Sequence, residues 1–155
     1  MKILMVCLGN ICRSPLAEGV LQEKLNRKGL DIKVDSAGTG GWHVGQRPDL
    51  RAIAIANKYG VDISHQKARQ FSPTDFQEFD IIYAMDGSNL SDIVALAKSS
   101  EDIEKVRLIL DELNVENNNY VPDPYYGGDE GFEKVYQLLD AACEIITKKM
   151  CNGKR

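Results

Sequence analysis

The sequence is poor in cysteine, in long apolar runs and in positive charge, and each shortage excludes a class of protein. Its 155 residues contain four cysteines, too few and too widely spaced for the disulfide framework of a small secreted domain. No apolar stretch approaches the roughly 18 residues that a membrane span needs. The net charge of −4 argues against a broad nucleic-acid surface. We therefore expect a cytoplasmic protein with reduced thiols that binds neither membranes nor nucleic acids.

Metal-binding clusters and targeting segments are also missing. The two histidines, His43 and His65, lie far apart, and no CxxC pair is present, so the short-spaced ligands of a structural zinc site are lacking. The apolar run between Lys2 and Cys7 is too short for a signal peptide. The sequence therefore predicts a protein that needs neither a metal ion nor another cofactor.

Short apolar segments alternate with segments of helical periodicity along the whole chain. Strands are expected at 2–7, 31–36, 80–85 and 105–110, helices at 14–29, 49–59, 87–98 and 131–150, and a short helical turn after Ser72-Pro73. Ser14 is the expected N-cap of the first helix. Gly29 and Gly60 lie just past the expected ends of the first and second helices. The alternation predicts an α/β fold, a single three-layer α/β/α domain over residues 1–155 with a central four-stranded parallel sheet.

The segment CLGNICRS, residues 7–14, joins the first strand to the first helix, where ligands bind in such folds. Backbone N–H groups and the helix dipole would make this loop a cradle for an anion. Arg13 adds a planar fork for two phosphate oxygens, and the positive field favours a Cys7 thiolate, a nucleophile toward phosphorus. Ser14 would hydrogen-bond the sulfur. Taken alone, Cys7 is more often a small apolar filler, so the combination with Arg13 carries the hypothesis.

The segment VPDPYYGG, residues 121–128, carries a candidate general acid. Asp123 stands between two prolines that restrict the backbone around it, which suits a carboxyl group that must be held in place. Tyr125 and Tyr126 would line a slot for an aromatic ring. A solvated Pro-Asp turn is the plainer interpretation of this segment taken by itself.

Together these two segments resemble the motifs of the low-molecular-weight protein tyrosine phosphatases. The resemblance rests on VCLGNICRSP near the N-terminus and DPYYG near the C-terminus, and also takes in DSAGTGGWHVGQRPD (35–49), ISHQKARQ (63–70) and MDGSNL (85–90). It covers essentially the whole chain. It implies a hydrolase for phosphotyrosine and other aryl phosphate monoesters that works through a phosphocysteine intermediate.

The resemblance also implies a role for individual residues. Cys7 would be the nucleophile, Arg13 would bind the phosphate, and Asp123 would act first as general acid and then as general base. The other implied residues are Leu8, Gly9, Asn10, Ile11, Cys12 and Ser14 for the phosphate, Trp42, Tyr125 and Tyr126 as pocket walls, and Ser36 and His65 as supports of Asn10. The implied partners are a phosphotyrosine-containing protein or aryl phosphate, and inorganic phosphate or other oxyanions, with the enzyme acting as a monomer.

Four other functions are compatible with parts of the sequence. An arsenate reductase on this scaffold needs two further cysteines after the third strand, and residues 84–105 contain none. The arginine-phosphatase branch carries a threonine where this loop has Ile11, and Ile11 offers no hydroxyl to a guanidinium leaving group. A silent phosphotyrosine-binding module stays open, although Cys7 and Asp123 are both present. A redox dithiol of Cys7 and Cys12 also stays open, although their spacing is not the CxxC spacing of a thioredoxin-like site. The resemblance separately implies that Cys12 can form a reversible disulfide with Cys7 and so protect it from irreversible oxidation.

Overall fold

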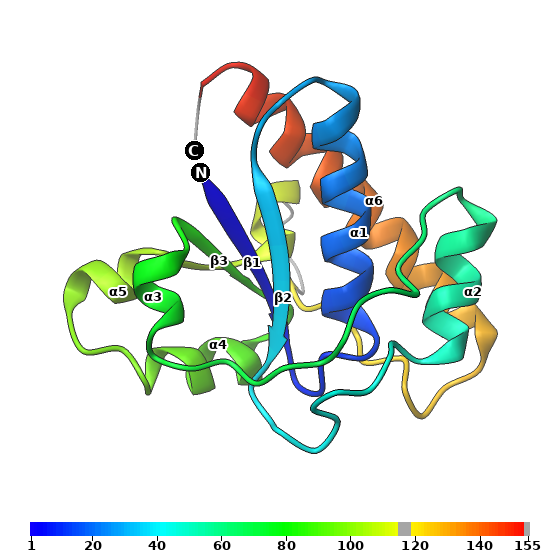
Figure 1. Cartoon of the computed structure of the whole chain (residues 1–155), viewed down its shortest axis with the longest axis horizontal. Coiled ribbons are helices and arrows are strands. Elements are labelled where there is room, and N and C mark those ends of the chain that lie inside the picture. Colours follow the sequence, from blue (N-terminus) through cyan, green and yellow to red (C-terminus); the bar gives the residue numbers. More distant parts are fainter. Residues whose placement is uncertain (115–118, 154–155) are drawn as a thin grey trace.

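The computed structural model describes residues 1–114 and 119–153, and it contains an all-parallel sheet (Figure 1). The strands are β1 (Lys2–Cys7), β2 (Lys33–Gly38), β3 (Ile81–Ala84) and β4 (Val106–Leu108), in the order β2-β1-β3-β4. The chain passes from β1 to β2 on one side and then crosses to β3 on the other. The carboxyl end of β1, where Cys7 lies, is therefore the switch point at which ligands bind in sheets of this kind.

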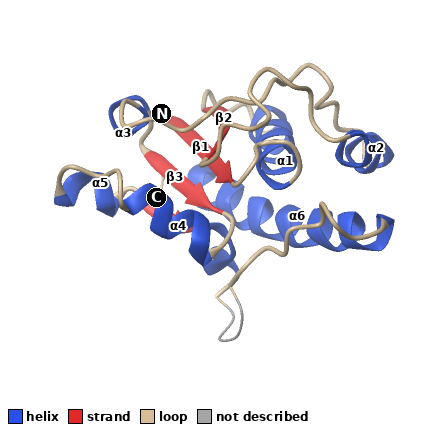
Figure 2. Ribbon diagram, turned by 90° about the horizontal axis from the view of Figure 1, so that it is seen from below, coloured by secondary structure: helices blue, strands red, loops and turns tan. Residues whose placement is uncertain are grey.

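Helices cover both faces of the sheet (Figure 2). One face carries α1 (Arg13–Arg27) and α6 (Asp129–Cys151), with α2 (Leu50–Lys58) packed beside them. The other face carries α3 (Asp75–Glu78) and α4 (Gly87–Val94), while α5 (Ser100–Glu104) lies against β4. This arrangement confirms the predicted three-layer α/β/α fold.

The central strand β1 is buried on both of its faces. Ile3, Met5 and Cys7 point into the core formed with α1 and α6, whereas Leu4 and Val6 point into the core formed with α3 and α4. Burial of each large side chain contributes about 1.5–3 kcal/mol to stability. The strand that ends in Cys7 is therefore anchored from both sides.

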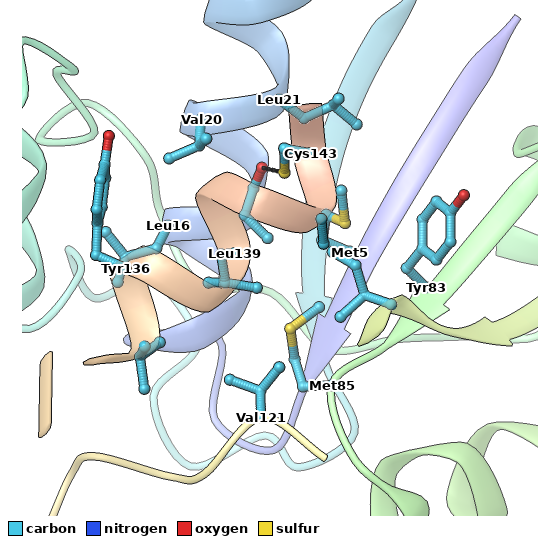
Figure 3. Close-up of a cluster of buried hydrophobic side chains, with 14 of the residues drawn as sticks. Met5, Leu16, Val20, Leu21, Tyr83, Met85, Val121, Tyr136, Leu139 and Cys143 are labelled. Carbon is cyan, nitrogen blue, oxygen red and sulfur yellow. Dashed lines mark hydrogen bonds between the residues drawn. The ribbon is translucent and has the colours of Figure 1, made fainter. Parts of the chain in front are cut away.

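The larger of the two cores lies between the sheet and the pair α1 and α6 (Figure 3). Leu16 of α1 and Leu139 of α6 are both fully buried and belong to the same cluster of side chains as Met5 of β1. Cys143 of α6 is also fully buried and donates a weak hydrogen bond to the carbonyl of Ala17, with 3.9 Å between sulfur and oxygen. This packing fixes α1, and with it the start of the helix that follows the Cys7 loop.

The second strand lies two residues later than the sequence predicted. β2 spans Lys33–Gly38 instead of 31–36, because it pairs along the full length of β1, from Lys2 opposite Lys33 to Cys7 opposite Gly38. A Cβ atom on Gly38 would lie 2.7 Å from the carbonyl oxygen of Leu8 and 3.1 Å from the nitrogen of Asn10. The end of β2 therefore needs glycine so that the loop after β1 can approach.

The start of α1 also differs from the prediction. The helix begins at Arg13 with Cys12 in the N-cap position, so Ser14 is not the N-cap. The Ser14 hydroxyl instead contacts the sulfur of Cys7. The ends of the first two helices are as expected, since Gly29 and Gly60 both have left-handed backbones, with φ of 69° and 80°.

The segment between 87 and 113 contains more breaks than the sequence suggested. The helix expected over 87–98 ends at Val94, and the separate helix α5 begins after Ser99, whose Oγ accepts the N–H of Asp102 at 3.2 Å. β4 has three residues and passes into a 3₁₀ turn, Ile109–Leu113. The expected helix is therefore four residues shorter, and Ser99 caps a second helix in a segment where none was expected.

The contact at Gly38 gives a first prediction. In Gly38→Ala the new methyl group meets backbone atoms that cannot swing away, so we expect a loss of about 1–3 kcal/mol in the free energy of unfolding, as for overpacked cores. Urea unfolding measures this loss. Gly127→Ala is the matched control, because a Cβ there would meet only Pro124 O at an ordinary 3.6 Å. Equal stability of the two variants would contradict the conclusion that position 38 needs glycine.

Candidate active site

The loop after β1, residues 8–12, is held in shape by the side chain of Asn10. This residue is buried and has a left-handed backbone with φ of 57°, which is uncommon for a residue with a side chain. Its Oδ1 accepts the backbone N–H of Arg69 at 3.0 Å, which fixes the orientation of the amide. Its Nδ2 therefore donates twice, to Ser14 Oγ at 2.8 Å and to Ser36 Oγ at 2.9 Å. Three hydrogen bonds thus hold the loop in one conformation.

Cys7 lies at the base of this loop with donors aimed at its sulfur. The N–H of Asn10 donates to Cys7 Sγ at 3.3 Å, and Ser14 Oγ lies 3.0 Å from the same atom. Ser14 Oγ already accepts a hydrogen from Asn10, and its own hydrogen has two acceptors in reach, the sulfur and, at 3.4 Å, the carbonyl oxygen of Ala37. Donors that converge on a sulfur atom stabilise negative charge on it. The arrangement suits a thiolate.

The rest of the loop presents unused donors to the same space. Among the described residues, the backbone N–H groups of Gly9, Ile11 and Cys12 have no acceptor. Arg13 and Ser14 are the first residues of α1, and N–H groups in a first helical turn have no partner within the helix. The positive end of the helix dipole adds to them. These groups together form an anion cradle directly above Cys7.

Arg13 is buried at the edge of the cradle and is held by two elements distant in sequence. Its Nη1 donates to Asp86 Oδ2 at 2.6 Å and to the carbonyl oxygen of Val121 at 3.0 Å. Both hydrogens of Nη1 are thus used within the protein. The edge formed by Nε and Nη2 is left to face the cradle, and this edge gives the two-point fork that binds phosphate oxygens.

Asp123 faces the same space from the loop before α6. Its Oδ1 accepts the backbone N–H of Tyr125 at 3.0 Å, and its Oδ2 lies 3.6 Å from Arg13 Nη2. The side chain is partly exposed, with a relative accessibility of 39%. Asp123 is therefore both oriented and reachable from the pocket.

A cleft of about 350 Å³ opens above these groups. Trp42 and Tyr126 stand at its mouth and are 70% and 94% exposed, while Tyr125 packs edge-on against Tyr126 with 5.0 Å between ring centroids. The cleft is lined by Cys7, Leu8, Gly9, Ile11, Cys12, Arg13, Trp42, His43, Asp123, Tyr125 and Tyr126. A polar floor under aromatic walls fits an anion that carries an aromatic group.

One of the two residues expected to support Asn10 does not do so. Ser36 lies behind the loop and bonds to Asn10, but His65 is exposed and makes no hydrogen bond to any described residue of the loop. Its neighbour Gln66 is the buried residue, and its Nε2 donates to the carbonyl of Pro15 at 3.1 Å. The prediction for His65 is therefore corrected, because the chain turns the next side chain inward.

The second cysteine of the loop differs from the first. Cys12 is buried, and this burial, together with the nearby charge of Asp49, raises the pKa of its thiol well above the usual range. Cys12 therefore stays a neutral thiol at physiological pH. Of the two loop cysteines, Cys7 is the one whose sulfur receives hydrogen bonds.

Three residues of this site were not predicted to act there. Asp86 anchors Arg13 and also caps α4, since its Oδ1 accepts the N–H of Asn89 at 2.8 Å. Arg69 tethers Asn10, and Glu18 Oε1 accepts the hydroxyl of Ser36 at 2.7 Å. Asp86 and Arg69 lie inside segments that carried the resemblance, but only the tertiary contacts reveal what they hold.

In residues 1–114 and 119–153, no group of three or more His, Cys, Asp or Glu side chains is placed to hold a metal ion. None of the described helices is both long and apolar enough to cross a membrane.

Comparison with known proteins assigns the chain to a family. Residues 2–154 match the family model described as low molecular weight phosphotyrosine protein phosphatase. Low molecular weight phosphotyrosine protein phosphatase 1 of Drosophila melanogaster is 45% identical over 151 residues, which cover 96% of each chain. These matches confirm the resemblance drawn from the sequence motifs.

Solved structures show the same fold. A protein tyrosine phosphatase from Entamoeba histolytica, crystallised with HEPES in its active site, superposes with a TM-score of 0.92 at 37% identity, covering 99% of this chain and 98% of that one. A Drosophila arginine phosphatase superposes with a TM-score of 0.91 at 33% identity, covering 97% of this chain and 98% of that one. The fold therefore accommodates more than one kind of phosphorylated substrate.

The carboxyl group of Glu18 gives a prediction on pH. Burial is the main cause that raises its pKa from 4.5 to about 7; Asp35 adds to the rise, while the Ser36 hydroxyl and Arg69 oppose it. The folded state therefore holds this proton more tightly than the unfolded state. The resulting stabilisation is complete below about pH 4.5 and is lost as the pH rises to about 7, by up to about 3 kcal/mol.

Urea unfolding between pH 4.5 and pH 8 measures the effect. The free energy of unfolding of the wild type should fall relative to that of Glu18→Gln, which cannot ionise, as the pH rises through this range. A difference between the two proteins that does not change with pH would show that Glu18 does not titrate in this way.

Proposed function

Because the chain belongs to the low molecular weight phosphotyrosine protein phosphatase family and is a phosphatase, we propose that it hydrolyses phosphotyrosine and other aryl phosphate monoesters through a phosphocysteine intermediate. The observation that carries the proposal is the convergence of three groups on one cleft. Cys7 lies at its floor, the fork of Arg13 at its edge, and Asp123 stands 3.6 Å from Arg13.

In the first step the Cys7 thiolate attacks phosphorus, forming the S–P bond while the bond from phosphorus to the phenolic oxygen breaks. The free N–H groups of the loop and the Nε–Nη2 edge of Arg13 bind the phosphoryl oxygens and stabilise their charge in the transition state. Asp123, protonated at this point, gives its proton to the departing phenolate. The products are the phosphocysteine enzyme and the free phenol.

In the second step Asp123, now a carboxylate, takes a proton from a water molecule that attacks phosphorus. The S–P bond breaks and inorganic phosphate is released. Cys7 leaves as a thiolate, and the hydrogen bonds from Ser14 and from the N–H of Asn10 stabilise the charge it regains. The enzyme returns to its starting state without a metal ion or another cofactor.

The walls of the cleft favour an aryl phosphate over phosphoarginine. Trp42, Tyr125 and Tyr126 offer ring faces to a phenyl group. Ile11, which also lines the cleft, is a branched apolar side chain that can accept no hydrogen bond from a guanidinium leaving group. Because a Drosophila arginine phosphatase shares the fold, phosphoarginine is the alternative substrate to be compared with phosphotyrosine.

We further propose that residues 1–155 form one domain that acts as a monomer in the cytoplasm on phosphotyrosine-containing proteins, with inorganic phosphate and other oxyanions as competing ligands. The four cysteines, all within the described residues, are free thiols, as a reducing compartment would leave them. Residues 115–118 and 154–155 belong to the proposed domain but lie outside the described residues.

The test is a leaving-group series of aryl phosphates, measured as kcat/KM in EDTA with reduced protein. Cys7→Ser should show no turnover while it still binds phosphate. Asp123→Ala should lose about 10²–10⁴-fold with phenyl phosphate. That loss should shrink as the leaving group becomes more acidic and needs less protonation.

Asp62→Ala is a matched control for Asp123→Ala, because Asp62 also accepts a backbone N–H two residues later, at 2.9 Å, but lies outside the cleft. It should leave the kinetics unchanged. An Asp123→Ala loss that is constant across the series would remove Asp123 from the role of acid. Phosphate binding without turnover in the wild type would indicate a phosphotyrosine-binding module, and faster turnover of phosphoarginine would overturn the substrate class.

A further inference from the structure

The segment that carries Asp123 has little to hold it in place. It has no regular secondary structure between Tyr120 and Gly128 and is largely exposed beyond Pro124. Val121 is tied to the sheet region through its N–H, which donates to Met85 O at 2.8 Å. After Val121, the hydrogen bonds that join this segment to other described elements come from one side chain, that of Arg51 in α2. Asp123 itself also faces Arg13, with 3.6 Å between Oδ2 and Nη2, but the backbone that follows Asp123 is tied to α2 through Arg51.

Arg51 donates hydrogen bonds to the backbone of this segment at two points. Its Nη2 donates to the carbonyl oxygen of Tyr125 and its Nη1 to that of Gly127, both at 2.9 Å. The guanidinium also lies over the ring of Phe132 at the start of α6, 4.7 Å from the centroid. The Arg51 side chain thus reaches from α2 to the loop that carries Asp123 and to α6, which follows that loop. Figure 1 shows α2 and α6 beside one another.

Arg51 is itself fixed to the phosphate loop through Asp49. Its Nε and Nη2 both bond to the Asp49 carboxylate at 3.0 Å, and these hydrogen bonds are the main cause that lowers the pKa of Asp49. The backbone N–H of Asp49 donates to the carbonyl oxygen of Ile11 at 2.8 Å. A short path of hydrogen bonds therefore joins the loop that binds phosphate to the loop that carries the acid.

We propose that Arg51 is a positioning residue that sets the place of Asp123 relative to Cys7 without touching the substrate. It is not among the residues that line the cleft. The inference rests on the proposed function, because Asp123 must act as general acid for its position to matter. Arg51 should then affect the steps that use Asp123 and leave the binding of phosphate almost unchanged.

Lysine cannot replace arginine here. The guanidinium uses Nε and both Nη groups in fixed directions to reach a carboxylate and two carbonyl oxygens at once. An ammonium group is a point charge that cannot span these acceptors. Arg51→Lys keeps the charge and most of the stem, so it separates geometry from charge.

The experiment measures kcat/KM for phenyl phosphate and para-nitrophenyl phosphate, together with inhibition by vanadate, in Arg51→Met and Arg51→Lys. Both variants should lose about 10- to 100-fold with phenyl phosphate, the usual cost of a misplaced catalytic group. The loss should be much smaller with para-nitrophenyl phosphate, whose phenolate leaves without help. Vanadate inhibition should change by less than about twofold, because the cradle, Cys7 and Arg13 are intact.

A double-mutant cycle gives the decisive readout. In the Asp123→Ala background, Arg51→Met should cost almost nothing more, because a positioning residue has no effect once the group it positions is absent. Arg27→Met is the control for removing an arginine, since Arg27 is exposed and, within residues 1–114 and 119–153, pairs only with Glu23 on the same helix. It should leave every kinetic constant unchanged. Thermal unfolding is followed for each variant, and if Arg51→Met is unfolded the cycle is completed with Arg51→Lys.

Three outcomes would overturn the inference. An equal loss in both backgrounds would show a general structural effect, and rescue by lysine would show that only charge matters. A parallel loss of vanadate binding would place Arg51 in the cradle instead. If the wild type itself failed to hydrolyse aryl phosphates, the proposed function would fail first, so the two failures are distinguishable.

Discussion

The site depends on the direction of the hydrogen bonds around Asn10. The N–H of Arg69 fixes Asn10 Oδ1 as an acceptor, so both hydrogens of Nδ2 must go to serines. Ser36 passes its own hydrogen to Glu18. The Ser14 hydroxyl has two acceptors in reach, Cys7 Sγ at 3.0 Å and the carbonyl oxygen of Ala37 at 3.4 Å, and the sulfur is the nearer. The hydrogen bonds of these uncharged side chains have a fixed donor-to-acceptor direction. They hold Asn10 in its left-handed backbone conformation and place Ser14 beside the sulfur of Cys7. The loop backbone adds one donor of its own, the N–H of Asn10, which lies 3.3 Å from the sulfur.

Local arrangement, not overall charge, makes this cleft attractive to an anion. The whole chain carries a net charge of −4, and Arg13 is bordered by the carboxylates of Asp86 and Asp123. The positive potential comes from unpaired N–H groups and a helix start, which act over a few ångströms. Asp86 occupies the part of Arg13 that phosphate does not need. Asp86 therefore orients Arg13 without covering its Nε–Nη2 edge, whereas Asp123 faces that edge, 3.6 Å from Nη2.

The local features could be predicted from the sequence, whereas the contacts between distant segments could not. Cys7, the loop and the start of α1 are adjacent in the chain, so their meeting follows from one strand and one helix. Ser14 was expected as an N-cap because that is the local preference, but the sulfur of Cys7 takes its hydroxyl. His65 and Gln66 lie in a segment without regular secondary structure, so the sequence has no periodicity that shows which of the two side chains faces inward. The hydrogen bonds from Arg51 to Tyr125 and Gly127 join residues 74 and 76 positions apart, and no pattern in the sequence predicts them.

The most direct test of the account is to trap the covalent intermediate. The wild type is mixed with para-nitrophenyl phosphate and quenched with acid during turnover. It is then digested, and the masses of its peptides are measured by mass spectrometry. The account predicts one added phosphoryl group, located on the peptide that contains Cys7 and assigned to its sulfur. Turnover with the phosphoryl group on another residue, or with no covalent adduct at any time, would contradict it.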